Sequence, residues 1–373
     1  MGGVTRQALL ALMVLVCPLT ALRSQPSVHL PASGSCAQCR VAFQRVTTLG
    51  TATDDGYLTA NPLWAAMDRV GRIYVGLQPP GDLLLVFDTS GRFTGRVGRK
   101  GTGPAEFTFP VIALPKANGH LLVWDFQLGM LTTLDSRHRY VRQFHQAHPP
   151  AAILADGRQL VVASTQDREG VGYPLHIYDD HGQRVTSFGS VGRFASSESW
   201  RLMRTVAVGP SGRIWSANQD EYRIEEWTPD LSRGRTFTRS VPWMPRVETR
   251  SDGVTGERPN AFIIALSEDD NGRLWVFSRV PSENWKEALG TPRQRPGRPA
   301  TYPNRDRGQL FDTMVDIIDL RSNVLLISQR LRSHVRFMLR KDLVASYRED
   351  ANATPLLDIS RVQLNTSTRR DQR

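Results

Sequence analysis

Cysteine is scarce in this sequence, with three residues in a chain of 373. Cys17 lies in an apolar N-terminal run, so Cys36 and Cys39 are the two that remain for the folded protein. Two cysteines exclude a framework of several disulfides, and without a second pair they exclude a four-cysteine zinc site. Arg40 stands where covalent haem attachment needs a histidine. We expect a local disulfide between Cys36 and Cys39 in an oxidising compartment, with a redox-active pair as the alternative.

Long apolar runs are also missing, apart from one near the N-terminus. Residues 8–22 form an uncharged apolar run of 15 residues, which is short for a membrane span. We expect a secretory signal peptide over residues 1–24, cleaved between Ala21 and Ser24. Lipid attachment at Cys17 is the alternative, disfavoured because a valine precedes it where a lipoprotein signal needs a small residue. The expected protein is exported, periplasmic or extracellular, and its mature chain has no transmembrane segment.

Runs of like charge are absent outside one loop, although the chain is basic. The net charge is +11, and removing residues 1–24 takes away Arg6 and Arg23 but no acidic residue, which leaves +9. The basic residues are dispersed among acidic ones, and an exported protein rarely meets nucleic acid. Nucleic-acid binding is therefore not expected.

Helical periodicity is nearly absent, and an internal repeat is present instead. A glycine turn, a basic or polar residue and a short β-rich run recur at residues 68–76, 116–125, 154–164, 209–218 and 269–278. The turn glycines are Gly71, Gly119, Gly157, Gly212 and Gly272. Each lies where a tight hairpin needs a positive φ. The repeat therefore predicts a series of antiparallel hairpins.

A second apolar strand and a second polar turn follow each of these hairpins, which gives four short strands per unit, the size of a propeller blade. Five units are explicit. We expect the sixth to join residues 333–364 to an outer strand within residues 39–50 and so to remove free sheet edges. The predicted fold is all-β: a six-bladed β-propeller of four-stranded antiparallel blades, closed by strands from both chain ends. Seven blades are the alternative, because the stretch after Pro281 could hide a degenerate blade.

The predicted organisation follows from this count. The signal peptide is followed by an N-terminal segment over residues 25–38, the propeller over residues 39–364 and a disordered tail over residues 365–373. Within blade five, residues 281–312 form a basic, proline-rich insertion.

The repeats resemble six-bladed β-propellers of the NHL-repeat kind. "GRKGTGPAEFTFP" is similar to the opening of that family's repeat, "WAAMDRVGRIYV" to its next part and "NQDEYRIEEW" to its close. The similarity is spread over most of residues 40–364, but repeats two and three lack the opening glycines, and Gly76 or Ala217 stands at the position that Asp125 fills. The whole chain also resembles uncharacterised exported six-bladed propellers of bacteria with an N-terminal cysteine pair. Neither resemblance implies an activity, because propellers host hydrolases, lyases, sensors and passive binding modules.

The glycine-rich stretch "RVGRKGTGPAEFTFP", residues 96–110, could be taken for a phosphate-binding loop. Such a loop needs a following helix, and Pro104 and Pro110 bracket residues that cannot start a long one. We interpret the stretch as the link between the first two blades, with Phe107 filling the gap between sheets and Pro110 starting the next inner strand.

A catalytic set does not emerge from the sequence. No G-x-S-x-G elbow occurs, and each of the eight histidines is expected to be a solvated surface residue. A calcium-dependent lactonase, esterase or lyase with six blades would place acidic and amide oxygens around the central tunnel. The candidate ligands in equivalent loops are Asp125, Asn218 and Asp220. Turn formation explains the same residues without a metal.

The insertion in blade five carries the strongest basic cluster. Its candidate anionic-ligand residues are Arg293, Arg295, Arg298, Arg305 and Arg307. Trp285 and Tyr302 suggest contact with an anionic surface or polysaccharide, while a mobile solvated loop is the alternative.

The sequence therefore favours a monomeric, non-catalytic binding or sensor module. Its partner could be a protein, a glycan or a small molecule, and no cofactor is expected. A calcium-dependent hydrolase or lyase with its metal in the tunnel is the alternative function.

Overall fold

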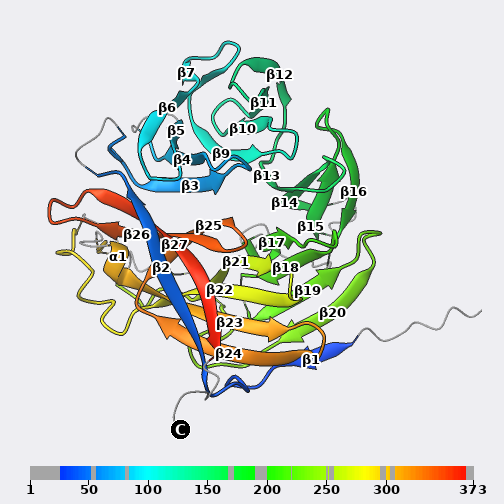
Figure 1. Ribbon diagram of the computed structural model, residues 1–373, viewed down its shortest axis with the longest axis vertical. Helices are drawn as coiled ribbons and strands as arrows, with labels where there is room; N and C mark the ends of the chain where they lie inside the picture. The colour runs from blue at the N-terminus through cyan, green and yellow to red at the C-terminus, as the bar shows by residue number, and fades with distance from the viewer. Residues whose placement is uncertain are drawn as a thin grey trace, which may run out of the picture.

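The computed structural model describes residues 26–51, 56–79, 84–166, 172–189, 200–219, 221–248, 251, 256–294, 300–302 and 307–366. Six β-sheets follow one another around a ring (Figure 1). The chain is therefore an all-β, six-bladed propeller, and the seven-blade alternative is wrong. The predicted signal peptide and residues 367–373 of the predicted tail lie outside the described residues.

Each blade is a meander of four antiparallel strands, numbered here from the axis outwards. Blade 1 contains β3 (Pro62–Met67), β4 (Ile73–Leu77), β5 (Leu84–Phe87) and β6 (Phe93–Val97). Blade 2 contains β9 (Pro110–Pro115), β10 (Leu121–Asp125), β11 (Met130–Leu134) and β12 (Tyr140–His145). Blade 3 contains β13 (Pro150–Ile153), β14 (Gln159–Gln166), β15 (Gly172–Tyr178) and β16 (Arg184–Phe188).

The other three blades include strands from both ends of the chain. Blade 4 contains β17 (Arg204–Val208), β18 (Ile214–Asn218), β19 (Arg223–Trp227) and β20 (Arg233–Thr238), with β1 (Ser27–His29) as a fifth, parallel strand. Blade 5 contains β21 (Phe262–Glu268), β22 (Arg273–Pro281), β23 (Phe311–Asp319) and β24 (Val324–Leu331). Blade 6 contains β25 (His334–Arg340), β26 (Leu343–Glu349), β27 (Pro355–Thr366) and β2 (Cys39–Leu49).

The five repeated hairpins share one backbone hydrogen bond, in which the N–H of the turn glycine donates to the carbonyl of the first turn residue. In blade 1, Asp68 Oδ1 accepts hydrogen bonds from the backbone N–H groups of Val70 and Arg72, and Oδ2 accepts one from Arg72 Nε at 2.6 Å. The fourth turn residue, Gly71, has a φ of +92°, where a side chain would be strained. All five predicted turn glycines have positive φ, which confirms the hairpin prediction.

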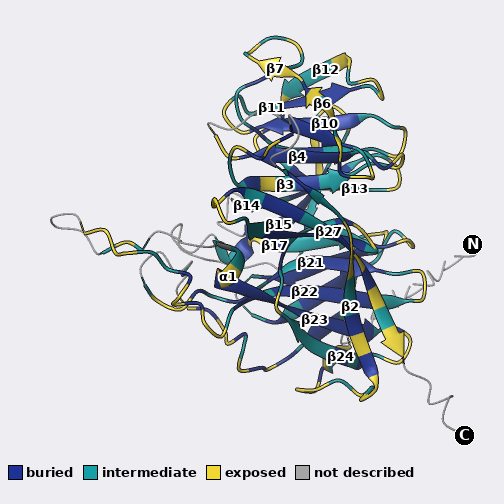
Figure 2. Ribbon diagram, turned by 60° about the vertical axis from the view of Figure 1, so that its left-hand side comes forward, coloured by how far each residue is buried: buried dark blue, intermediate teal, exposed yellow. Residues whose placement is uncertain are grey.

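The middle strands are buried on both faces because each blade packs against two neighbours. Every residue of β4, β5 and β10 is buried, so these strands are continuous apolar runs with few polar residues rather than alternating patterns. The outer strand β6 is more exposed, as Figure 2 shows for the outer parts of the ring. The core is therefore a set of apolar layers between blades.

The ring closes as the sequence predicts. β2 pairs antiparallel with β27 from Cys39 opposite Thr366 to Leu49 opposite Leu357, and becomes the outer strand of blade 6. The side-chain amide of Gln329 in blade 5 bonds both the N–H and the C=O of Val41. The two residues before position 367 belong to β27, so the propeller extends past the predicted boundary at residue 364.

Residues 27–36 form a strap that crosses the outer edges of blades 4 and 5. β1 pairs with β20, and the N–H groups of Ser35 and Cys36 donate to the carbonyls of Leu325 and Leu326 in β24. Disulfide formation between Cys36 and Cys39 at the end of the strap confirms the predicted pairing. The strap is thus part of the propeller, which begins before the predicted start at residue 39.

Backbone N–H groups of the glycine-rich link, residues 96–110, form hydrogen bonds within the link itself. The N–H groups of Arg99 and Gly101 donate to carbonyls in β8 and just before it, and Gly103 donates to Glu106 Oε2 at 2.8 Å. β7 (Arg99–Lys100) and β8 (Glu106–Phe107) pair in this way. Phe107 is fully buried, and a Cβ on Gly98 would lie 2.4 Å from its ring. The link is architectural, with its N–H groups bonded inside the loop rather than arranged for phosphate.

The insertion lies between β22 and β23, as predicted, and contains a short α-helix, α1 (Arg307–Leu310). Trp285 is 9% exposed and packs with Ala288, Leu310 and Phe311. Its ring therefore supports the insertion from inside, and its predicted role in surface contact is wrong.

Candidate functional site

The alternation of strand direction creates two different ends of the propeller axis. The hairpins between first and second strands lie at one end, which we call the hairpin end. The inter-blade links and the blade-five insertion lie at the other, which we call the link end. In Figure 2, α1 and the described part of the insertion lie on one side of the propeller.

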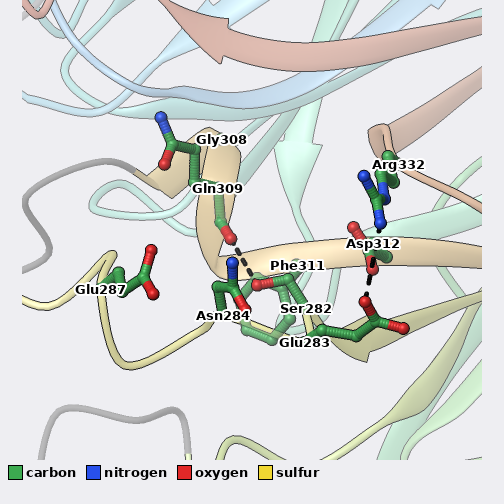
Figure 3. A pocket seen from close by; sticks show the side chains of 9 residues that line it. All are labelled: Ser282, Glu283, Asn284, Glu287, Gly308, Gln309, Phe311, Asp312 and Arg332. Atoms are coloured by element: carbon green, nitrogen blue, oxygen red, sulfur yellow. Dashed lines mark hydrogen bonds and ion pairs between the residues drawn. The ribbon is translucent and has the colours of Figure 1, made fainter.

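A small polar pocket of about 260 Å³ lies at the link end beneath the insertion (Figure 3). Its lining residues are Ser282, Glu283, Asn284, Glu287, Gly308, Gln309, Phe311, Asp312 and Arg332. Ser282 Oγ donates to the carbonyl of Gln309 at 2.7 Å, which ties the start of the insertion to α1. Glu283 and Arg332 form an exposed ion pair at 3.7 Å. The pocket is thus mixed in charge and partly closed by its own contacts.

Asp312 is the most buried charged residue of this pocket. Burial raises the pKa of its carboxyl group, and the nearby Glu283 adds to that rise, while the guanidinium of Arg330, 3.2 Å from Oδ2, opposes it. One buried acid beside an exposed acid does not make a catalytic pair without a nucleophile or a bound substrate to place it.

The larger cavity lies at the hairpin end, where three neighbouring inner strands finish. It measures about 790 Å³ and is lined from β17, β21 and β25 with their following turns. Ala207, Val208, Pro210, Leu266 and Met338 supply its apolar wall. Inner strands of successive blades meet around the axis, so this cavity is the axial mouth of the propeller. An open apolar cavity of this size is the usual shape of a small-molecule site.

The charged side chains of the axial mouth are paired. Glu268 accepts a hydrogen bond from Trp215 Nε1 at 2.8 Å and pairs with Arg213 of the neighbouring blade. In the turn after β25, Arg340 pairs with Asp342 at 2.8 Å, and Lys341 reaches Asp270 of blade 5. The mouth therefore offers an apolar wall and a rim of paired charges.

The candidate calcium ligands do not gather at this mouth. Both oxygens of Asp125 accept backbone hydrogen bonds, Oδ2 from Thr108 and Phe109 and Oδ1 from Gln127 and Leu128. This carboxylate holds the link and loop of blade 2 in place. Asn218 donates to Glu221 in blade 4, and Asp220 lies outside the described residues. Among the described residues, no three histidine, cysteine or acidic side chains converge as metal ligands would.

The basic residues predicted in the insertion are only partly described. Arg293 forms a backbone bridge with Thr301, and Arg307 begins α1. Arg295, Arg298 and Arg305 lie outside the described residues. The proposed anionic-ligand loop therefore stays a prediction.

Two histidines expected at the surface are buried. His176 is fully buried in β15, with Nδ1 2.8 Å from Ser187 Oγ and Nε2 3.3 Å from the carbonyl of Ala163. His334 begins β25 and packs between Phe311 and Tyr347. The prediction of solvated histidines was wrong for both, because their strands face neighbouring blades on either side.

Burial makes the stability of the protein sensitive to mild acid. Desolvation lowers the pKa of His176, and also that of His138 and His148, below the ordinary value near 6.5. Below that value the unfolded chain binds protons that the folded chain does not, so stability falls as the pH decreases. We expect a lower free energy of unfolding at about pH 5.5 than at about pH 7.5. Equilibrium unfolding in urea at the two pH values measures this difference in free energy.

His176→Gln provides the matched control. It removes one of the titrating groups and should reduce the pH dependence by up to about one proton between the two states. An unchanged pH dependence in this variant would mean that His176 is not responsible. The carboxylates, including Asp312 and Asp316 whose pKa values are raised by burial, are the same in the wild type and the variant, so the difference between the two pH dependences isolates His176.

The residues of the axial mouth were not selected by sequence reasoning. Leu266 and Met338 are ordinary apolar residues near the ends of inner strands, and Arg340 is the last residue of β25, next to a polar turn. Their shared position, at the end of the first strand of three successive repeats, is the signal that could have identified them.

Comparison with known proteins identifies the fold. The model of a protein family described as "6-bladed beta-propeller" (DUF5128) matches residues 46–143. A candidate exported protein from Bacteroides fragilis superposes with a TM-score of 0.57 at 10% identity, covering 91% of this chain and 99% of that one. A DUF4221 family member from Bacteroides vulgatus superposes with a TM-score of 0.55 at 10% identity, covering 88% and 99%.

No protein of curated function matches this sequence. Among the described residues, no helix is long and apolar enough to span a membrane. The similarities therefore extend to the fold, and function has to be argued from the site.

Proposed function

We propose that this protein is an exported, non-catalytic binding propeller that accepts an apolar group in the axial mouth at the hairpin end. The observation that carries the proposal is the open cavity of about 790 Å³ at the ends of β17, β21 and β25, with an apolar wall. Burying a ligand against such a wall is favourable in proportion to the apolar area covered. The apolar N-terminal run and its polar flank support export.

The state of the charged rim supports binding rather than catalysis. Glu268, Arg340 and Lys341 each have an ionic partner, so none of these three charged side chains of the mouth is an isolated acid or base. Catalysis of hydrolysis would need such a group within reach of the substrate.

Nile red, a neutral apolar dye that fluoresces in apolar surroundings, tests the proposal. We expect it to bind the purified protein, and Met338→Asp to weaken binding by about 10-fold or more because a carboxylate enters the apolar wall. Val185→Asp is the matched control, since Val185 is 54% exposed on the outer strand of blade 3. Equal loss in both variants, or no binding to the wild type, would contradict the proposal.

Metal analysis of the same preparation separates the competing function. A calcium-dependent hydrolase should contain calcium in a fixed ratio and should gain melting temperature when calcium is added. We expect neither. A stoichiometric metal that is lost on replacing Asn218 would favour the hydrolase.

A further inference from the structure

We propose that the ligand of the axial mouth is an anionic amphiphile, with an apolar chain in the cavity and a carboxylate-like head at the turn Arg340–Asp342. This inference rests on the proposed function and adds the chemical class of the ligand. It is carried by the distribution of charge around the rim, which is uneven although each group is paired.

The turn after β25 gathers more cations than anions. Arg340 and Lys341 line the cavity, and Arg361 reaches the same turn from β27. The facing anions are Asp342, which pairs with both Arg340 and Arg361, and Asp270, which pairs with Lys341. Three cations against two anions leave a local charge of 3−2=+1.

The other acid at the mouth does not cancel this excess. Glu268 is buried, and its carboxylate is bonded by Arg213 and Trp215 on the side of blade 4. Arg340, Lys341 and Arg361 each keep 49% of their side chains exposed, and the facing Asp342 and Asp270 keep 39% and 69%. The excess of one positive charge therefore comes from the number of exposed groups, three cations against two aspartates, directly beside the apolar wall.

An amphiphilic anion matches both parts of this arrangement. Its chain would cover Leu266, Val208 and Met338, and its head would share the guanidinium of Arg340 or the ammonium of Lys341 with the aspartates. The net charge of the chain without residues 1–24, 11−2=+9, adds a long-range attraction for anions and a repulsion for cations. A cationic amphiphile of equal length lacks both advantages.

The experiment uses three eight-carbon probes against bound Nile red: octanoate, octanol and octylammonium. Each should displace the dye if the chain enters the mouth. We expect octanoate to act at a concentration about 10-fold lower than octylammonium, with octanol between them, near physiological salt. Equal displacement by all three would overturn the anion preference and leave the apolar site in place. Failure of the dye itself to bind would reject the proposed function.

Two substitutions with opposite signs assign the preference to the turn. Lys341→Gln should weaken the binding of octanoate by about 5-fold and leave the binding of octanol unchanged, because it removes one exposed cation. Asp342→Asn should strengthen the binding of octanoate, since it removes the anion that pairs with Arg340 and Arg361. Arg137→Gln is the control, because Arg137 lies in an exposed turn of blade 2 outside the cavity. It should leave the binding of both octanoate and octanol unchanged. Octanoate binding that is indifferent to both rim variants would overturn the proposal.

Discussion

Replacing Asp316 with alanine is expected to lower the free energy of unfolding by about 3–5 kcal/mol. Asp316 in β23 pairs with Arg239 at 2.7 Å, and the two side chains are 1% and 0% exposed. Tyr222 of blade 4 donates a hydrogen bond to the same carboxylate oxygen at 2.8 Å. Without Asp316, a guanidinium remains buried between two blades with no opposite charge.

The position of Arg239 extends this effect to the strap. Its Nε and Nη2 donate to the carbonyls of Pro31 and Ala32, so one buried side chain connects blade 4, blade 5 and the N-terminal segment. Burial raises the pKa of Asp316, and Arg239 and Tyr222 oppose that rise by bonding its carboxylate. The pair is therefore a structural junction.

Equilibrium unfolding in urea measures the loss. Asp180→Ala is the matched control, because Asp180 is 52% exposed in its pairs with Lys116 and Arg142 and should cost less than about 1 kcal/mol. Arg239→Met combined with Asp316→Leu should be less harmful than Asp316→Ala alone, since no unpaired charge stays buried. A loss below about 1 kcal/mol for Asp316→Ala would show that water reaches the site.

Deleting residues 26–49 together with the preceding segment is expected to abolish a single cooperative unfolding transition. The deletion removes β1, the strap and β2, and so leaves β27 as a free edge. It also removes Val41 and Leu49, which are buried against blades 5 and 1. An open ring exposes the apolar layers on both sides of the break.

The comparison is a chain that lacks only residues 1–25. Size-exclusion chromatography and tryptophan fluorescence in urea should show a monomer with one transition for this chain, and aggregation or a broad transition for the longer deletion. A monomer with an unchanged midpoint after the longer deletion would mean that β2 is not needed for closure.

Much of the fold could be predicted because its signals are local. A glycine at the fourth turn position, preceded in four of the five hairpins by asparagine, aspartate or serine, and short β-rich runs on either side define each hairpin within about ten residues. The outer strand at residues 39–49 was also predictable, since it is a strand without sequential partners and closure removes free edges. The strap was missed because three residues of β1 have no pattern of their own and are ordered by β20 and Arg239.

The sequence alone determined the architecture of this protein: an all-β chain of repeated hairpins, six blades and a local disulfide at Cys36 and Cys39. Only the tertiary structure decided where ligands can bind. The axial mouth combines residues more than one hundred positions apart, such as Val208 and Met338, and their ordinary apolar character becomes a cavity wall only when three inner strands end together. The tertiary structure also assigned Asp125 to backbone donors and Trp285 to the interior, because burial and hydrogen-bond partners depend on the neighbouring blade and loop.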